Sequence, residues 1–307
     1  MNPIYGNDFA YVYNDKWAYW GERMWPFLRK AVKKEVPHGS TWLDLCCGSG
    51  SLLKFICKEG FSAVGIDLSE HQISFAKQNV PHATILQGDI RELSLPQSFD
   101  VITCMFDSLN YLTLKRDLAR VFSRVRLHLK QKGLFAFDIN TYEGLQDLWC
   151  ATTTTDDKNS TIIIETSFNK KRALGRCLVT GFLKDGKLYR KFQEEHIERG
   201  YKAYEIDNLL NKAGFTFKKY DGSTFSNPRK RSAKLFELVV NGEMACREAA
   251  ERGHSAEAEL ALYITHGLLH NVGFDDATED DAEEMHQMED EILQQEGYGC
   301  VYNTNGD

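Results

Sequence analysis

The feature that most constrains the fold is an alternation of short apolar runs with amphipathic stretches along the first half of the chain. The apolar runs are predicted strands, at residues 41–46, 62–67, 82–87, 99–105 and 133–139. Alternation of this kind produces parallel strands joined by crossover helices. The sequence therefore predicts an α/β fold with a doubly wound, mainly parallel sheet and helices on both faces.

Helical periodicity fills the stretches between these strands. Ser69 with Gln72 three positions later forms a capping-box pattern, which predicts that a helix begins there and runs toward Asn79. Predicted helices also cover residues 17–34, 51–60, 113–129 and 205–215. Two further predicted strands, 217–222 and 234–240, bring the expected sheet to seven strands.

The pattern changes at about residues 155–200. This stretch is rich in β-forming residues, and turn residues such as Asp185-Gly186 separate its apolar segments. We interpret it as an antiparallel β insertion that acts as a lid over the site.

Charge divides the chain of 307 residues into two parts. Residues 241–307 carry 17 acidic and 2 basic side chains, a net charge of −15, whereas residues 1–240 have a net charge of +8. We expect two domains with a boundary at 240/241, the second small and mostly helical. No apolar run is long enough to span a bilayer and no secretory signal is visible, so we expect no membrane association. Eight cysteines fit free thiols in the cytoplasm.

A glycine turn follows the first predicted strand. Asp44 precedes Gly48 and Gly50, and the helix that follows offers free backbone N–H groups to a ligand. Asp67 ends the second strand, where a carboxylate can accept both hydroxyls of a ribose. The NAD pattern G-x-G-x-x-G is broken, because two of its three glycines are replaced by Cys46 and Ser51. The acidic Asp44 favours a cofactor with a cationic amino acid end.

Four motifs, DLCCGSG, VGIDLS, GDI and FDVITCMFDSLNYL, resemble those of the class I S-adenosylmethionine-dependent methyltransferases. The start, YGNDFAYVYND, is similar to that of a small-molecule subgroup of this family. The resemblance covers about residues 1–240. It implies a Rossmann-like sheet of seven strands, S-adenosylmethionine as cofactor and in-line methyl transfer to a small-molecule acceptor.

The resemblance also implies a set of cofactor-binding residues. Gly48 and Gly50 would face the methionine part and Asp67 would hold the ribose. The adenine would lie against Asp89 with Ile90, and Tyr13 would close over the cofactor. The full implied set is Tyr13, Asp44, Cys46, Gly48, Gly50, Asp67, Leu68, Asp89, Ile90 and Phe106. Cys46 departs from the family, which usually has glycine or alanine there.

Methyl transfer requires few catalytic groups, because most of the rate comes from alignment of the acceptor and exclusion of water. A base is needed only when the acceptor arrives protonated. The candidates are Asp107, Asn110 and Tyr111 in the loop after the fourth strand, and His196 in the lid. Tyr111 could equally be a core residue, and His196 could be an exposed histidine on a strand.

The acidic segment carries a second chemical motif. His266 and His270 are four residues apart on a predicted helix, so both imidazoles share one face, and Asp276 follows Gly273 as a third metal ligand. Zinc accepts this ligand set. A metalloprotease HExxH motif is excluded because Gly267 takes the place of the glutamate.

This segment, about residues 242–297, resembles the second half of the YbeY family of endoribonucleases and rRNA maturation factors, with Asp276 where a third histidine is usual. The resemblance implies zinc and single-stranded RNA as partners, although a charge of −15 repels phosphates. Three hypotheses stay open for the segment: a zinc-dependent ribonuclease, a packed helical appendage and an acidic interaction module. The acceptor's identity and the oligomeric state are not indicated by the sequence.

Overall fold

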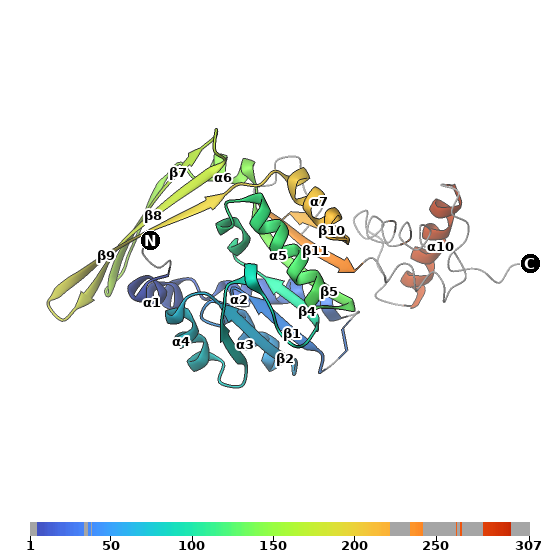
Figure 1. Cartoon of the computed structure of the whole chain (residues 1–307), viewed down its shortest axis with the longest axis horizontal. Coiled ribbons are helices and arrows are strands. Elements are labelled where there is room, and N and C mark those ends of the chain that lie inside the picture. The colour runs from blue at the N-terminus through green and yellow to red at the C-terminus, as the bar shows by residue number, and fades with distance from the viewer. Residues whose placement is uncertain are drawn as a thin grey trace, which may run out of the picture. The chain divides into compact units, whose positions relative to one another are not determined.

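A computed structural model describes residues 5–33, 36–37, 39–221, 234–241, 262, 265 and 279–295 (Figure 1). The chain divides into two compact units, Met1–Val240 and Asn241–Asp307. In the second unit the described element is α10, Glu279–Gln295. The predicted metal ligands His266, His270 and Asp276 lie outside the described residues.

The first unit is built on a mainly parallel sheet. Five strands run parallel, in the order β5-β4-β1-β2-β3. β11 pairs antiparallel with β5, and β10 follows it. The bounds are β1 Thr41–Leu45, β2 Ser62–Asp67, β3 Thr84–Gln87, β4 Phe99–Cys104, β5 Leu129–Asn140, β10 Phe215–Asp221 and β11 Lys234–Asn241. The predicted α/β fold is confirmed.

Alternate strand residues face opposite sides of this sheet, and each side has its own core. Leu43 and Phe137 pack with α5 and α7, whereas Trp42 and Ala136 pack with α2, α3 and α4. The helices have the bounds α2 Trp20–Lys33, α3 Ser51–Lys58, α4 Glu70–Asn79, α5 Lys115–His128 and α7 Ala203–Lys212. Helices therefore cover both faces, as the alternation predicts. Among the helices of the described ranges, none is long and apolar enough to cross a bilayer.

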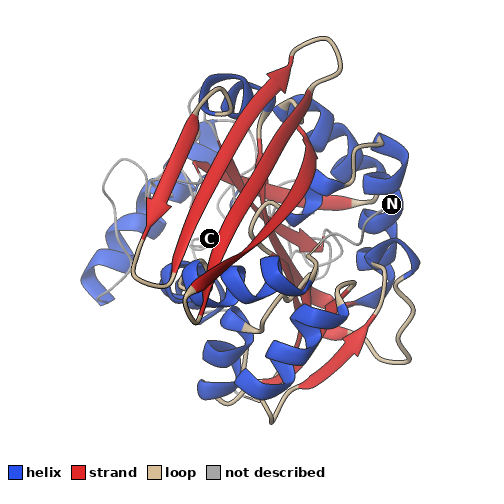
Figure 2. Ribbon diagram, turned by 90° about the vertical axis from the view of Figure 1, so that its left-hand side faces the viewer, coloured by secondary structure: helices blue, strands red, loops and turns tan. Residues whose placement is uncertain are grey.

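A separate antiparallel sheet follows β5. Its order is β6-β7-β8-β9, and Figure 2 shows its long, twisted strands clearly. The strands are β6 Thr152–Asp156, β7 Ser160–Asn169, β8 Leu174–Asp185 and β9 Leu188–Arg199. The predicted antiparallel insertion is thus present. Its first strand, β6, begins slightly earlier than position 155.

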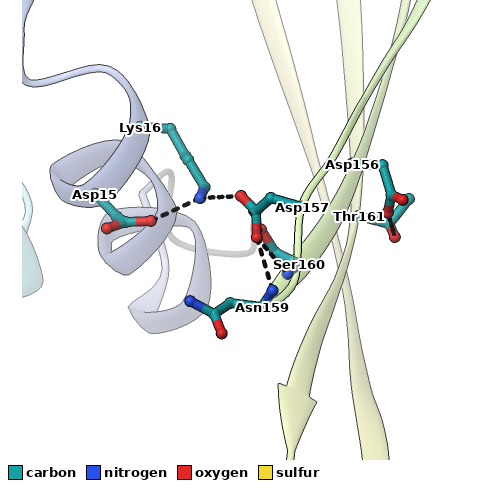
Figure 3. A network of polar contacts seen from close by, with 7 residues as sticks. All are labelled: Asp15, Lys16, Asp156, Asp157, Asn159, Ser160 and Thr161. Carbon is teal, nitrogen blue, oxygen red and sulfur yellow. Dashed lines mark hydrogen bonds and ion pairs between the residues drawn. The ribbon is translucent and has the colours of Figure 1, made fainter.

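The N-terminal helix α1, Asn7–Lys16, packs on this antiparallel sheet. Phe9 and Val12, one turn apart, form a small apolar core with Ile162, Val179 and Leu183. A polar network also joins the end of α1 to the β6–β7 turn (Figure 3). In it the Lys16 ammonium pairs with Asp157, whose carboxylate also accepts the backbone N–H groups of Asn159 and Ser160. Helix α1 is therefore fastened to the antiparallel sheet by apolar and polar contacts.

Three short elements extend the architecture beyond the sequence-based expectation. They are α1, β6 and α6 (Tyr142–Leu148). Two short 3₁₀ turns also follow strands β3 and β4, η1 (Ile90–Glu92) and η2 (Ser108–Tyr111). The six cysteines among the described residues are free thiols, as predicted.

Candidate active site

A cavity of about 440 Å³ opens at the carboxyl ends of β1, β2, β3 and β4. This is the edge at which doubly wound sheets bind ligands. Eight of the ten predicted cofactor residues line it: Tyr13, Cys46, Gly48, Asp67, Leu68, Asp89, Ile90 and Phe106. Tyr111, one of the predicted catalytic residues, lines it too.

The glycine turn after β1 forms one wall. Gly48 has a φ angle of +54°, and a Cβ atom built on it would lie 3.6 Å from Cε1 of Tyr13. The Tyr13 ring therefore lies against the glycine turn. Its closure over a bound cofactor stays a prediction. Cys46 also has a positive φ, +54°, a conformation that glycine adopts with less strain. This positive φ angle explains why glycine is common in the family at the position of Cys46.

Gly50 serves packing rather than the cavity. It has φ +80° and precedes α3, and a Cβ atom there would lie 3.0 Å from a methyl group of Val80. Such a contact is tighter than normal packing, so Gly50 lets α3 and α4 approach closely. It does not line the cavity, in contrast to Gly48.

Asp67 holds the glycine turn in place. One carboxylate oxygen accepts the N–H of Gly48 at 2.8 Å, and the other accepts the N–H of Ser69 at 2.9 Å. Burial raises the pKa of this carboxyl in spite of these hydrogen bonds. Asp67 therefore connects the ends of β1 and β2 while it faces the cavity.

Asp44 is buried beneath the cavity and does not line it. Its carboxylate accepts a hydrogen bond from the Thr103 hydroxyl at 2.7 Å, and that hydroxyl accepts the indole N–H of Trp42 at 3.0 Å. Burial raises the pKa of Asp44 to about 7. Burial raises the pKa of Tyr13, and the charges of Asp107, Asp67, Asp138 and Asp44 raise it further. This end of the cavity is thus acidic and suits a cationic ligand.

The opposite end is formed after β3. The Asp89 carboxylate accepts the backbone N–H of Arg91 at 2.9 Å and pairs with its guanidinium, which lowers the pKa of Asp89. These bonds begin the 3₁₀ turn that carries Ile90, a side chain only 5% exposed. An apolar side chain beside a carboxylate offers the surface and the acceptor that a purine requires.

The loop after β4 has strained backbone. Phe106 and Asp107 have φ angles of +65° and +51°, which are unusual for residues other than glycine and recur at functional sites. Asn140 holds Asp107 through a side-chain hydrogen bond of 2.7 Å. Burial raises the pKa of Tyr5, Tyr13 and Tyr111, and the charge of Asp107 adds to the effect on each of them. Asp107 therefore lies beside the aromatic part of the cavity, although it does not line it.

Tyr111 and His196 meet across the two sheets. The Tyr111 hydroxyl lies 3.0 Å from Nδ1 of His196 and 3.4 Å from the Tyr5 hydroxyl. His196 is 3% exposed, so the alternative of an exposed strand histidine is wrong. Burial lowers its pKa to about 4, and the imidazole is neutral at physiological pH. Its contact with Glu194, 3.4 Å from Nε2, is therefore not an ion pair.

Asn110, by contrast, has a structural role. Its amide donates to the backbone carbonyls of Asn140 and Arg199 at 2.8 and 2.7 Å, and its oxygen accepts the N–H of Asn140 at 2.9 Å. The side chain is fully buried. Asn110 thus joins the end of β5 to the end of β9 and has little capacity left for a substrate.

An N-terminal strap, which we define as residues 5–16, was missed as a whole by sequence reasoning apart from Tyr13. The N–H groups of Tyr5 and Gly6 donate to the Glu194 carboxylate, and the Ser69 hydroxyl donates to the Tyr5 carbonyl at 2.9 Å. Tyr5 also lines the cavity. The strap therefore connects α4 and β9 above the cavity. The motif YGNDFAYVYND was the sequence signal for this segment, but it did not indicate these contacts.

The residues present fit S-adenosylmethionine. The cavity has the volume of a small-molecule site, an acidic end for positive charge, and a glycine turn that a larger side chain would fill against Tyr13. Fold and site together define an α/β enzyme of the methyltransferase class.

Comparison with known proteins identifies the family. The family model described as methyltransferase domain matches residues 43–133. A Bacillus subtilis protein named as a methyltransferase, YqeM, is 30% identical over 234 residues, which cover 74% of this chain and 94% of YqeM. The chain belongs to the S-adenosylmethionine-dependent methyltransferases.

Two further relatives support this assignment. The crystal structure of an S-adenosylmethionine-dependent methyltransferase from Clostridium acetobutylicum has a TM-score of 0.69 and 30% identity, with coverage of 76% of this chain and 98% of that one. A Streptomyces venezuelae enzyme named dTDP-3-amino-3,4,6-trideoxy-alpha-D-glucopyranose N,N-dimethyltransferase is 26% identical, over 62% of this chain and 81% of that enzyme.

The C-terminal part is similar to a different family. The family model described as endoribonuclease YbeY matches residues 203–297, which begins earlier than the predicted segment at 242. Endoribonuclease YbeY of Caldicellulosiruptor bescii is 43% identical over 63 residues, 20% of this chain and 40% of that protein. The chain thus spans less than half the length of this relative. Within the described ranges, no three His, Cys, Asp or Glu side chains group as metal ligands.

Proposed function

We propose that the first unit transfers a methyl group from S-adenosylmethionine to a small-molecule acceptor. The observation that carries the proposal is the cavity at the carboxyl ends of the parallel strands, where an acidic glycine turn faces the tyrosines of the strap and of the loop after β4. A relative that is named for the N,N-dimethylation of an amino sugar nucleotide supports an acceptor of this size.

S-adenosylmethionine supplies an activated methyl group, so the protein has to bind the cofactor, align the acceptor with the methyl group and exclude water. Gly48 and Asp67 would hold the cofactor from one side, Ile90 from the other, and Tyr5 with Tyr13 would cover it. His196 is too weak a base to take a proton at neutral pH, because burial lowers its pKa to about 4. We assign it the role of fixing the Tyr111 hydroxyl, which would orient the acceptor. Asp107 does not line the cavity, so we propose that it acts on the acceptor through its charge rather than by direct contact.

The Tyr111→Phe variant should separate orientation from cofactor binding. The change removes the hydroxyl contacts with His196 and Tyr5 and keeps the ring. We expect kcat to fall about tenfold to a hundredfold, because misplacement of the acceptor by about 1 Å can reduce the rate by this much. The dissociation constant for S-adenosylhomocysteine, measured by calorimetry, should change less than about twofold. An unchanged kcat would exclude the proposed role of Tyr111.

Asp44 should make cofactor binding depend on pH. Its pKa of about 7 means that it is mostly protonated near pH 6 and mostly ionised near pH 8. The sulfonium and ammonium of S-adenosylmethionine favour the ionised form, so affinity should fall as the pH is lowered through 7. Binding near pH 6.5 should release a proton, which calorimetry in two buffers with different ionisation enthalpies measures. Asp44→Asn should abolish this release, and equal release by both proteins would contradict the assignment.

The class of acceptor can be tested directly. The full chain is incubated with radiolabelled S-adenosylmethionine and a cell extract divided into small molecules, RNA and protein. We expect label in the small-molecule fraction and none with the Asp67→Ala variant. Label confined to RNA or protein would overturn the small-molecule proposal.

A second candidate function belongs to the C-terminal segment. The match to the YbeY family and the 43% identity to a YbeY protein favour a zinc-dependent cleavage of single-stranded RNA. His266, His270 and Asp276 would be the zinc ligands, with two imidazoles and a carboxylate leaving one coordination position open.

Metal analysis of the purified full chain tests this second candidate. We expect close to one equivalent of zinc after growth in zinc-replete medium, and a loss of most of it in His266→Ala. RNA cleavage that depends on His266 would support the ribonuclease. Less than about a tenth of an equivalent of zinc would count against the metal site and favour a helical appendage or an acidic interaction module.

A further inference from the structure

The side-chain amide of Gln72 is a buried polar group that nothing in the described part of the chain satisfies. Gln72 lies in the first turn of α4, is 1% exposed and lines the cavity. Neither its Oε1 nor its Nε2 has a hydrogen-bond partner among the described residues. A buried amide without partners is unfavourable, so folded proteins pair such groups with protein, water or ligand. The cavity is where a partner for Gln72 fits.

The location of the amide limits which part of a ligand it can meet. A Cβ atom built on Gly48 would lie 4.0 Å from Oε1 of Gln72 and 3.6 Å from the Tyr13 ring. Gln72 therefore belongs to the glycine-turn end of the cavity, not to the end formed by Asp89 and Ile90. Its backbone is fixed there, since the N–H of Gln72 donates to the Ser69 hydroxyl at 3.3 Å.

The electrostatics of this end make a neutral donor useful. Four carboxylates, those of Asp44, Asp67, Asp107 and Asp138, act on Tyr13 beside it. They attract an ammonium or sulfonium group but repel a carboxylate carried by the same ligand. An amide can donate to that carboxylate through Nε2 and accept from the ammonium through Oε1, without adding charge.

We infer that Gln72 binds the α-amino-acid end of the cofactor and positions it beside the glycine turn. This inference rests on S-adenosylmethionine as the ligand of the cavity. It gives Gln72 a role separate from the capping box that the sequence suggests, because only the Ser69 half of that box forms.

The test compares two ligands that differ in the amino-acid end. S-adenosylhomocysteine has this end, whereas 5′-methylthioadenosine keeps the adenine and ribose and lacks it. Calorimetry on the full chain measures both ligands with the wild type, with Gln72→Met, which conserves volume, and with Gln78→Met, the same change on the exposed side of α4.

We expect Gln72→Met to weaken the binding of S-adenosylhomocysteine about tenfold to a hundredfold, which corresponds to the loss of one hydrogen bond to a charged group. Binding of 5′-methylthioadenosine should change less than twofold, and Gln78→Met should resemble the wild type with both ligands. The melting temperature of cofactor-free Gln72→Met should equal or exceed that of the wild type, since an unsatisfied amide is removed.

Two results would overturn the inference. One is an S-adenosylhomocysteine affinity that Gln72→Met leaves unchanged. The other is an equal loss for both ligands, which would place the contact at the nucleoside. A wild-type protein that binds neither ligand would instead refute the proposed cofactor, so the two failures are distinguishable.

Discussion

Asp67→Ala is expected to weaken S-adenosylhomocysteine binding by a hundredfold or more. The variant loses the acceptor of the Gly48 and Ser69 N–H groups, at 2.8 and 2.9 Å, and the acceptor proposed for the ribose. The bonds from Gly48 and Ser69 lie within the protein and hold the glycine turn, whereas the affinity depends on the bonds from the ligand. A hydrogen bond to a charged group contributes roughly 1.5–3 kcal/mol, so loss of both bonds proposed for the ribose hydroxyls corresponds to about a hundredfold in affinity or more. Isothermal calorimetry on the full chain gives the dissociation constant.

Asp67→Asn is the matched control for this experiment. It keeps one carbonyl oxygen that can accept from Gly48 or Ser69 but removes the charge. We expect the affinity of this variant for S-adenosylhomocysteine to lie between those of the wild type and the alanine variant. An alanine variant that binds within about threefold of the wild type would show that Asp67 has no part in the site.

Truncation after residue 233 is expected to abolish the fold of the first unit. It removes β11, which pairs with β5 from Leu134 to Asn140 and separates it from β10. The unpaired edge would include Phe135, Phe137 and Ile139, which are fully buried in the intact sheet. We expect the free energy lost with an interior strand to exceed the roughly 5–15 kcal/mol by which a folded domain is stable. Circular dichroism should show no cooperative melting transition.

A chain that ends at Asn241 is the control for this truncation. It keeps β11 and removes the acidic segment, so we expect cooperative melting, cofactor binding and methyl transfer to persist. Retained activity would also support the proposed domain boundary. If the chain that ends at Asn241 shows no melting transition, the first unit depends on residues after 241.

Four of the five parallel strands could be predicted to within two residues at each end, because their ends carry local signals, whereas β5 begins at Leu129, four residues before its predicted start. Asp67 closes β2 at its predicted last residue, and Gly60 with φ +86° marks the end of the helix before it. The missed elements lack such signals. In β6 every residue from Thr152 to Asp156 is exposed, and the strand is held by backbone pairing with β7, so no hydrophobic period exists to detect.

The candidate site was predictable where its residues follow strands in order. The positions after β1, β2 and β3 line the cavity, because parallel strands bring their carboxyl ends to one edge. Contacts between distant segments could not be predicted in this way. Glu194 meets the strap, and His196 meets Tyr111, only because the antiparallel sheet folds back over the loop after β4. The local capping-box pattern assigned Gln72 to the start of a helix, and its place in the cavity wall near Gly48 became visible only in the folded chain.

The strap also bears on how spent cofactor is exchanged for fresh cofactor. Tyr5 and Gly6 are fastened to Glu194 and Ser69, and Tyr5 has a strained φ of +61°. We expect product release to require that these bonds break, so the residence time of the product should follow the rate at which they open. An affinity tag at the N-terminus would be joined to the chain a few residues before this strap and could change its opening rate. Kinetic measurements should therefore use a tag placed elsewhere.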